Sequence, residues 1–178
     1  MRILAVSGSL RLGSSNGAIV DAAVLAAGDT AAVTVFGLLS ALPPFNPDLE
    51  RESTPPAVAA WRDALRASSA VLISSPEYAH GVPGVLKNAL DWVVGSGEFM
   101  SMPVALVNAS AYSAFVTEQL RETLTVMMAE VVVATSLPLR GRPSSAADIL
   151  AQPLATAELR AALQSLAEAA HRVAERSS

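Results

Sequence analysis

RILAVSGSLRLGSSNGAIVDAAVLAA, residues 2–27, is the stretch that decides the fold. Its first part, residues 2–6, is short, apolar and partly β-branched, which predicts a buried strand. Residues 16–27 predict a helix, and the loop between the two segments carries several hydroxyl groups and one cation, Arg11. A strand, a loop of hydrogen-bond donors and a helix N-terminus together favour binding of a phosphate group.

The glycine pattern of this loop limits which class of phosphate-containing ligand it can bind. Gly8 and Gly13 have the spacing of a P-loop, but Ser14 stands where that motif requires lysine, which disfavours a nucleoside triphosphatase. The dinucleotide fingerprint G-x-G-x-x-G is also absent. The remaining pattern suits one terminal phosphate held by hydroxyls, amides and the guanidinium of Arg11. An ordinary Ser/Gly turn, in which Ser14 or Asn16 caps the helix, is the alternative that stays open.

Composition excludes several classes of protein. The length of 178 residues suits a single domain over 1–178, and although 52% of the residues are hydrophobic, no stretch of membrane-spanning length is continuously apolar. No leader segment is recognisable, so we expect a cytoplasmic protein. The absence of cysteine and the presence of only two histidines exclude disulfides, thiol chemistry and a His-rich metal site. A net charge of −4 without a basic run argues against nucleic-acid binding.

Apolar runs alternate with helical patterns along the chain. Strands are predicted at residues 2–6, 31–36, 70–75, 103–108 and 130–135, and helices at 16–27, 55–68, 83–94, 115–128 and 156–176. Nearly continuous apolar strands indicate a parallel sheet covered on both faces, which makes a three-layer α/β/α sandwich. We expect the strand order 2-1-3-4-5, with a ligand at the carboxyl ends of strands 1 and 3. Two long connections, 37–56 and 137–153, are either functional or irregular surface segments.

A second group of polar residues follows the third predicted strand, in SSPEYAHGVPGVLKNALDW, residues 74–92. Pro76 ends the strand, and Glu77, Tyr78 and His80 then provide a carboxylate, a phenol and an imidazole. Each has a simpler interpretation as a solvated or packing side chain. His80 lacks a nucleophile in an elbow motif such as G-x-S-x-G, so a Ser–His–Asp hydrolase has little support.

The helix after this loop carries further expectations. Pro83 suits its first position, and Lys87 and Asp91 have the spacing of an i,i+4 ion pair. Trp92 is expected to act as a packing or subunit-interface anchor rather than as a catalytic residue.

Taken together, these segments resemble the NADPH-dependent FMN reductase family, which has a flavodoxin-like fold. Residues 8–16 are similar to its FMN-phosphate loop, G-S-x-R-x-x-S-x-N, and residues 76–92 to its flavin-ring motif, P-E-Y-N-x-x-x-P-G-x-L-K-N-x-x-D-W. Residues 42–50 are similar to a loop of the family that contains Pro and Asp. The resemblance covers nearly the whole chain.

The resemblance implies an FMN site and assigns its residues. The phosphate would be held by Ser9, Arg11, Ser14, Ser15 and Asn16. The isoalloxazine ring would be lined, largely through backbone groups, by Pro76, Glu77, Tyr78, Ala79, His80 and Gly81, and Ser110 would reach it from the loop after strand 4. No catalytic acid or base is implied, because the flavin itself carries the chemistry. The family also implies a homodimer or homotetramer.

Two departures from the family pattern bear on function. Ala79 replaces the usual Asn of the ring motif, and the loop at 108–114 has no glycine. The leading expectation is an oxidoreductase that passes hydride from NADPH or NADH through FMN to a quinone, azo compound, metal oxyanion or free flavin. One alternative is an FMN-binding electron carrier, which Arg11 and the modest charge disfavour. The other is a flavin-less interaction protein. Arg140 and Arg142 either meet a nicotinamide 2′-phosphate or are solvated.

Overall fold

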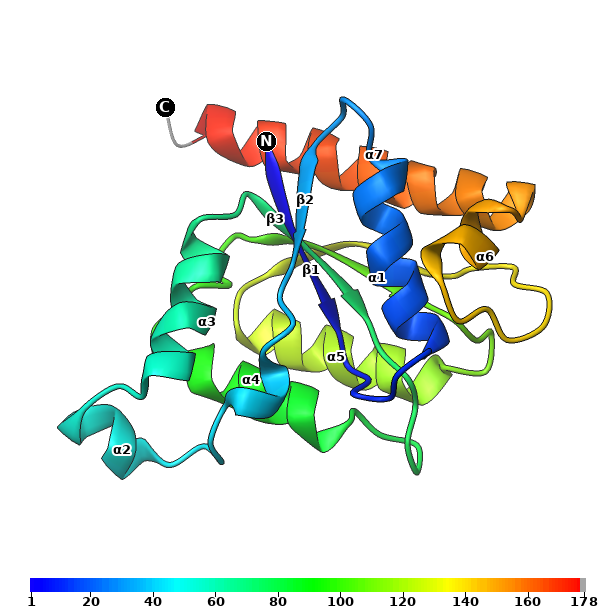
Figure 1. Ribbon diagram of the computed structural model, residues 1–178. Coiled ribbons are helices and arrows are strands. Elements are labelled where there is room, and N and C mark those ends of the chain that lie inside the picture. Colours follow the sequence, from blue (N-terminus) through cyan, green and yellow to red (C-terminus); the bar gives the residue numbers. More distant parts are fainter. Residues whose placement is uncertain (177–178) are drawn as a thin grey trace.

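The computed structural model describes residues 1–176, and its five strands form one parallel sheet (Figure 1). The strands are β1 (Arg2–Ser7), β2 (Ala32–Val35), β3 (Ala70–Ser74), β4 (Pro103–Asn108) and β5 (Glu130–Ser136). They are arranged in the order β2-β1-β3-β4-β5, which confirms the predicted flavodoxin-like topology. The main helices are α1 (Ser15–Ala26), α3 (Pro56–Arg66), α4 (Gly84–Val94), α5 (Ala114–Val126) and α7 (Pro153–Arg176).

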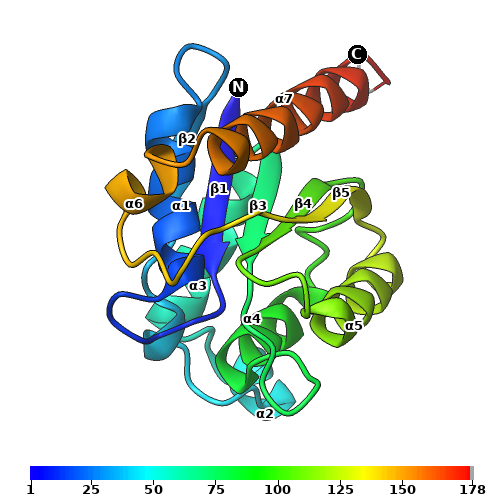
Figure 2. The same cartoon turned by 90° about the vertical axis from the view of Figure 1, so that its right-hand side faces the viewer.

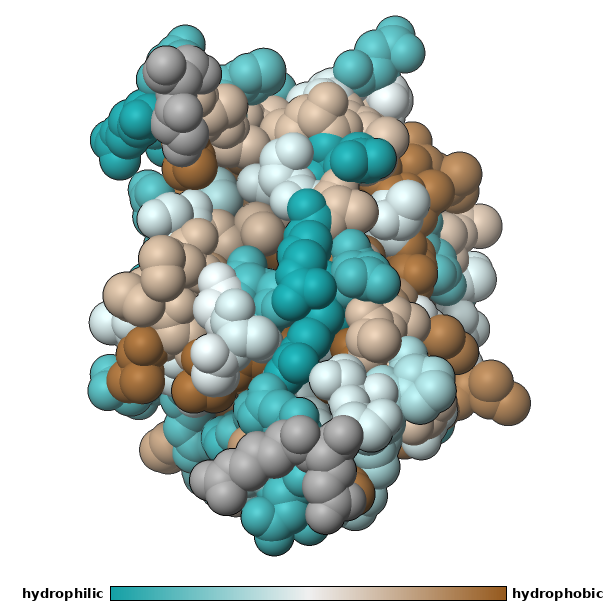
Figure 3. Space-filling view, turned by 90° about the vertical axis from the view of Figure 1, so that its left-hand side faces the viewer, coloured by the Kyte–Doolittle hydropathy of each residue, from teal (hydrophilic) through white to brown (hydrophobic). Residues whose placement is uncertain are grey.

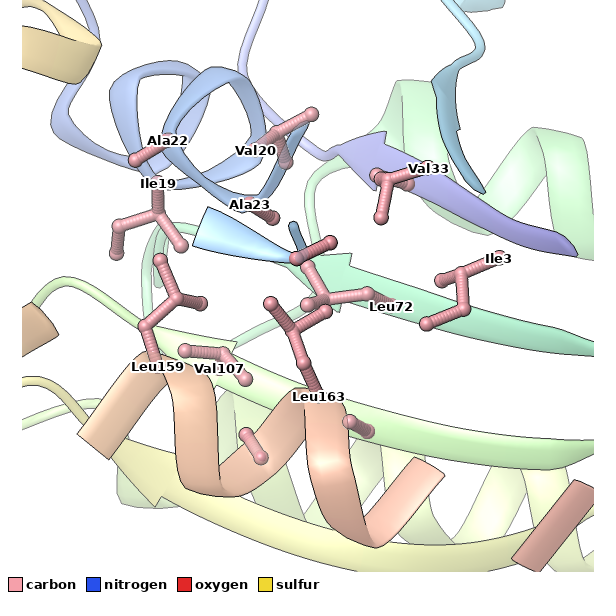
Figure 4. Packing of buried hydrophobic residues seen from close by; sticks show 14 of the residues in the cluster. Ile3, Ile19, Val20, Ala22, Ala23, Val33, Leu72, Val107, Leu159 and Leu163 are labelled. Atoms are coloured by element: carbon pink, nitrogen blue, oxygen red, sulfur yellow. The ribbon is translucent and has the colours of Figure 1, made fainter. Parts of the chain in front are cut away.

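The two faces of the sheet are covered by different helices, because side chains alternate between faces along each strand. Ile3 of β1 packs in the cluster that α1 and α7 cover, whereas its neighbour Leu4 packs on the side of α3, α4 and α5. Figure 4 shows Leu72 of the sheet beside Leu163 of α7, with side chains of α1 such as Ala23 in the same cluster. Figure 2 shows the resulting layers, with α1 and α5 on opposite sides of the sheet.

Short helices occur in both long connections, where the sequence predicted no regular structure. A 3₁₀ turn, η1 (Leu39–Ala41), and helix α2 (Pro47–Glu52) lie in the first, and α6 (Ala146–Leu150) lies in the second. The side-chain oxygen of Asn46 accepts a hydrogen bond from the Asp48 N–H (3.0 Å) and so caps α2. A reciprocal capping box between Ser145 and Asp148 starts α6.

Helix α4 anchors the first long connection. The indole N–H of Trp92 donates to the Pro43 carbonyl (2.7 Å), and the Asn88 amide donates to the same oxygen (2.9 Å). The side-chain oxygen of Asn88 accepts from the Phe45 N–H (2.7 Å). Trp92 is fully buried, so it is a packing anchor within the chain.

Two further expectations for α4 have different outcomes. Lys87 and Asp91 form the predicted ion pair at 2.6 Å. The expectation that Pro83 is the first helical residue is wrong, because Pro83 is the N-cap with extended backbone (ψ 136°) and the helix begins at Gly84.

The side of the molecule that carries α2 and α3 has a strip of hydrophilic surface between apolar areas (Figure 3). Helix α3 forms ion pairs from Arg62 to Glu50 and from Arg66 to Glu98, the latter at 2.6 Å. Among residues 1–176, no helix combines the length and the apolarity that crossing a membrane requires.

Candidate functional site

A cavity of about 930 Å³ opens at the carboxyl ends of the strands, where the connections that follow β1, β3, β4 and β5 meet. Its volume is in the range of small-molecule and cofactor sites. Of the predicted site residues, it brings together Ser9, Arg11, Ser14, Ser15, Asn16, Pro76, Glu77, Tyr78 and Ser110. Ala79, His80 and Gly81 do not line it. The two sequence segments that predicted a ligand therefore share one cavity.

The phosphate loop presents the N-terminus of α1 to this cavity. Ser14 is the N-cap, and its hydroxyl accepts a hydrogen bond from the Gly17 N–H (3.4 Å), so the capping alternative holds for this residue. Within residues 1–176, the N–H groups of Ser15 and Asn16 make no hydrogen bond to the protein. Unpaired N–H groups and the helix dipole give this end a positive potential.

Asn16 ties three connections together at the base of the cavity. It is only 7% exposed, and its side-chain oxygen accepts from the Ser74 hydroxyl (3.0 Å) and from the Ala109 N–H (3.2 Å). Asn108 makes a similar tie, because its side-chain oxygen accepts from the Ser75 N–H (3.1 Å). The oxygen of Asn16 therefore serves the protein, which leaves its backbone N–H for the predicted phosphate contact.

The ring motif forms a tight turn after β3. Tyr78 and Gly81 exchange two backbone hydrogen bonds of 3.1 and 2.9 Å, and the residues between them, Ala79 and His80, have φ values of 49° and 58°. Positive φ at both central positions is the pattern of a type I′ turn, which favours Asn and Gly. Ala79 thus occupies a left-handed position without the side chain that suits it.

Helix α5 stabilises this turn through hydrogen bonds and one ring contact. The Glu77 carboxylate accepts from the Val116 N–H in the first turn of α5 (3.1 Å). Gln119 donates to the His80 carbonyl (2.9 Å) and accepts from the Val82 N–H (3.2 Å). The imidazole of His80 packs edge-on against Phe115 of the same helix, with ring centroids 4.2 Å apart. Glu77 and His80 therefore have structural contacts, and Ala79 to Gly81 act by shaping the turn.

Further residues line the cavity that sequence reasoning did not assign to it. They follow β1, β4 and β5: Gly13, Ala109, Ser113, Gly141 and Ser144. All of them lie in connections that follow a predicted strand. This position was the signal available in the sequence, because connections at the carboxyl ends of parallel strands meet at one edge of the sheet. Tyr112 also lines the cavity and is 90% exposed, so its ring stands at the rim rather than over the floor.

The cavity carries two arginines, Arg11 and Arg142. The nearby carboxylate of Asp148 is already engaged, because it accepts hydrogen bonds from the backbone N–H groups of Ser144 (2.9 Å) and Ser145 (3.1 Å). The bond from the Ser144 backbone, followed by that from the Ser145 hydroxyl, holds the pKa of Asp148 below its usual value. The site is therefore cationic at its phosphate-loop end.

Comparison with known proteins agrees with this geometry. The sequence model of the NADPH-dependent FMN reductases matches residues 1–141. The chain belongs to this family. The predicted resemblance is thus confirmed, and both motif segments of the FMN reductases lie within the match, whereas Arg142 and Ser144 follow directly after it.

Individual relatives give the same result. An NAD(P)H-dependent FMN reductase of Pseudomonas aeruginosa is 37% identical over 113 residues, which cover 62% of this chain and 60% of that protein. A probable NADPH:quinone oxidoreductase of Oryza sativa subsp. japonica is 41% identical over 95 residues, which cover 52% of this chain and 47% of that protein. The chain thus spans about half to three fifths of the length of these curated relatives.

A solved structure supports the fold. The flavoenzyme FerB of Paracoccus denitrificans, an NAD(P)H:(acceptor) oxidoreductase, superposes with a TM-score of 0.74 at 21% identity, covering 96% of this chain and 97% of that one. At this identity the likeness shows the fold alone.

Proposed function

We propose that this member of the FMN reductase family binds FMN and passes hydride from NAD(P)H to a small-molecule acceptor. The observation that carries the proposal is the single cavity in which the phosphate loop, at Ser9 to Asn16, meets the ring motif, at Pro76 to Tyr78. The alternative of a flavin-less interaction protein does not require these two segments to share a cavity.

The residues present fit the phosphate of FMN. The unpaired N–H groups of Ser15 and Asn16 provide donors at the N-terminus of α1, and Ser9 and Arg11 of the same loop also line the cavity. Donors of this kind, one of them charged, form strong hydrogen bonds with a phosphate. The Ser15 hydroxyl donates to the Pro143 carbonyl (2.6 Å), so Ser15 would donate to the phosphate through its backbone N–H rather than through its hydroxyl.

The isoalloxazine ring would be lined by Pro76, Glu77 and Tyr78, which follow β3, and by Ser110, which follows β4, because all four residues line the cavity. When bound, FMN supplies the hydride chemistry by accepting a hydride from NAD(P)H and passing electrons onward. Hydrogen bonds to helix α5 hold the ring motif on either side of Tyr78: Glu77 accepts from the Val116 N–H, and Gln119 donates to the His80 carbonyl. Ala79, His80 and Gly81 contribute to this proposal through the shape of the turn.

The proposal also includes the electron acceptor, the oligomeric state and the cellular compartment. The names of the relatives, an FMN reductase and a quinone oxidoreductase, support a small acceptor of the quinone or flavin type. We propose a homodimer or homotetramer that works in the cytoplasm. Light scattering after size-exclusion chromatography of the flavin-loaded protein measures the assembly directly.

The test of the activity is an absorbance titration. Purified protein is titrated with FMN, and the visible flavin spectrum is then followed during anaerobic addition of NADPH and, in a second sample, of NADH. We expect saturable uptake of FMN with a change in its spectrum, followed by bleaching on addition of at least one nicotinamide.

The other outcomes decide between the alternatives. If FMN binds and dithionite bleaches it but neither nicotinamide does, the protein is an electron carrier. If no FMN binds, the site is non-functional. Ala79 and the glycine-free loop at 108–114, the two departures from the family pattern, are then the first positions to mutate toward that pattern. Turnover with a quinone, an azo compound and free FMN, each at equal concentration, then ranks the acceptors.

A further inference from the structure

Two cations without partners face one cavity in a chain whose net charge is −4. Within the described residues, neither Arg11 nor Arg142 forms an ion pair, and neither guanidinium donates a hydrogen bond. Arg62 and Arg66, by contrast, are engaged within the protein, because Arg62 pairs with Glu50 and Arg66 pairs with Glu98. Unpaired arginines on a ligand-sized cavity are available to an anion.

The connection that carries Arg142 contacts the phosphate loop through the two residues that directly follow Arg142. Pro143 accepts the hydrogen bond of the Ser15 hydroxyl at 2.6 Å. Ser144 packs beside the loop glycine, because a Cβ built on Gly13 would stand 3.5 Å from the Ser144 Cβ. The capping box at Asp148 then fixes the chain that follows. Arg142 is therefore held next to the N-terminus of α1 rather than carried on a distant loop.

We propose that Arg142 is a second phosphate-binding cation, acting opposite Arg11 on the phosphate of FMN. This inference rests on the proposed function. A phosphate monoester carries about −1.5 to −2 charges at pH 7, which one guanidinium leaves partly uncompensated. Arg11 lies within the phosphate loop, whereas Arg142 comes from the connection after β5 and lies just outside the segment that the FMN reductase match covers.

The consequence is a selection for phosphorylated flavin. Riboflavin has the same ring system as FMN but lacks the phosphate, so it gains nothing from either arginine. Loss of Arg142 is therefore expected to weaken FMN binding by about tenfold or more, as for a hydrogen bond to a charged group, while riboflavin binding stays unchanged.

Arg140 provides a matched control from the same connection. It lies two residues away and lines a different, smaller cavity with Pro138 and Leu154. Its backbone N–H donates to the Gln152 side chain (2.7 Å), an interaction that a side-chain change leaves in place. Arg140→Gln thus removes the same charge from the same segment without touching the proposed phosphate site.

The experiment compares wild type, Arg142→Gln, Arg140→Gln and Arg11→Gln. Dissociation constants for FMN and riboflavin are measured by quenching of flavin fluorescence, and those for FMN are repeated at several salt concentrations. We expect Arg142→Gln and Arg11→Gln to lose FMN affinity selectively and to reduce its salt dependence, because fewer charges meet the phosphate. Arg140→Gln is expected to match wild type.

Each other result has a distinct meaning. Wild-type affinity for FMN in Arg142→Gln overturns the inference and leaves the proposed function standing. Equal losses for FMN and riboflavin also overturn it, because they show a structural effect on the cavity. If FMN affinity is unchanged but KM rises for NADPH and not for NADH, Arg142 serves the 2′-phosphate of the donor instead. Failure of the wild type to bind any flavin refutes both the function and the inference.

Discussion

The carboxylate of Glu77 accepts a hydrogen bond from the N–H of Val116 (3.1 Å), although the two residues are 39 positions apart. Val116 is the third residue of α5, and the N-cap of that helix, Ser113, makes no side-chain capping bond. Glu77 therefore caps α5 from the connection between β3 and α4. Its negative charge is also favourable at a helix N-terminus. The position of the ring motif and the start of α5 are thereby coupled.

Removal of this cap has a measurable cost. We expect Glu77→Ala to lower the free energy of unfolding by about 1–2 kcal/mol, because the Val116 N–H loses its acceptor. Glu77→Gln keeps an acceptor oxygen and loses only the charge, so its loss should be smaller. Urea denaturation of the three proteins measures both effects. Equal stability of the alanine variant and the wild type would show that water replaces the carboxylate at no cost.

The turn at Ala79 is a site where a substitution should stabilise the protein. Asn adopts the left-handed region more readily than Ala, so Ala79→Asn is expected to raise the free energy of unfolding by up to about 1 kcal/mol. Ala79→Val is the matched opposite, because a β-branched side chain is strained at a φ of 49°. Thermal unfolding of both variants tests the pair. A valine variant as stable as wild type would mean that the turn adopts another conformation.

Asn16 allows its structural and ligand-binding roles to be separated. Asn16→Ala leaves the Ser74 hydroxyl and the Ala109 N–H without their acceptor and should lower the free energy of unfolding by about 2 kcal/mol or more. Asn16→Asp keeps an acceptor but places a negative charge beside the phosphate loop. We expect the aspartate variant to be more stable than the alanine variant and yet to bind FMN more weakly than wild type. Urea denaturation and FMN titration measure the two effects, and unimpaired FMN binding by the aspartate variant would contradict a phosphate at this loop.

Asp148 predicts a dependence of stability on acidic pH. Its pKa is lowered in the folded chain, chiefly by the hydrogen bond from the Ser144 backbone, so the folded state binds this proton more weakly than the unfolded state does. The ionised carboxylate therefore stabilises the fold above the unfolded pKa of about 3.9, and the contribution is lost as pH falls through the lower folded value.

The variant Asp148→Asn tests this dependence. It should be less stable than wild type at pH 7, and the difference should narrow as both proteins are taken below about pH 4. Thermal midpoints measured from pH 7 to pH 3 provide the comparison, with Asp29→Asn, at an exposed turn, as the control. A difference that stays constant with pH would rule out the carboxylate as its source.

Most of the fold could be predicted from local patterns in the sequence. The predicted strands at 70–75 and 103–108 are continuously apolar over residues 70–73 and 104–107. This indicates strands buried on both faces, and the structure places β3 and β4 there in the interior of the sheet. The start of α6 was also within reach, because Ser145 and Asp148 have the spacing of a capping box. It was missed because the surrounding connection is rich in Pro and Ser and has no helical periodicity.

The sequence predicted those parts of the candidate site that lie in one continuous segment of the chain. The phosphate loop and the ring motif each occupy one segment, and the cavity contains most of their residues. The cap on α5 by Glu77 and the tie made by Asn16 depend on partners far along the chain, which no local spacing reveals. The strain at Ala79 was hidden for a different reason, since the sequence has neither Gly nor Asn there to indicate positive φ.

The ties around the phosphate loop also set an order in which the protein can become functional during synthesis. Asn16 finds its partners 58 and 93 residues later, at Ser74 and Ala109, and Ser15 finds Pro143 only 128 residues later. At about 5–20 residues per second, a ribosome needs roughly 6–26 s to proceed from Ser15 to Pro143. The first segment to be made is thus among the last to be completed, and we expect a nascent chain that stops short of Pro143 to emerge without capturing flavin.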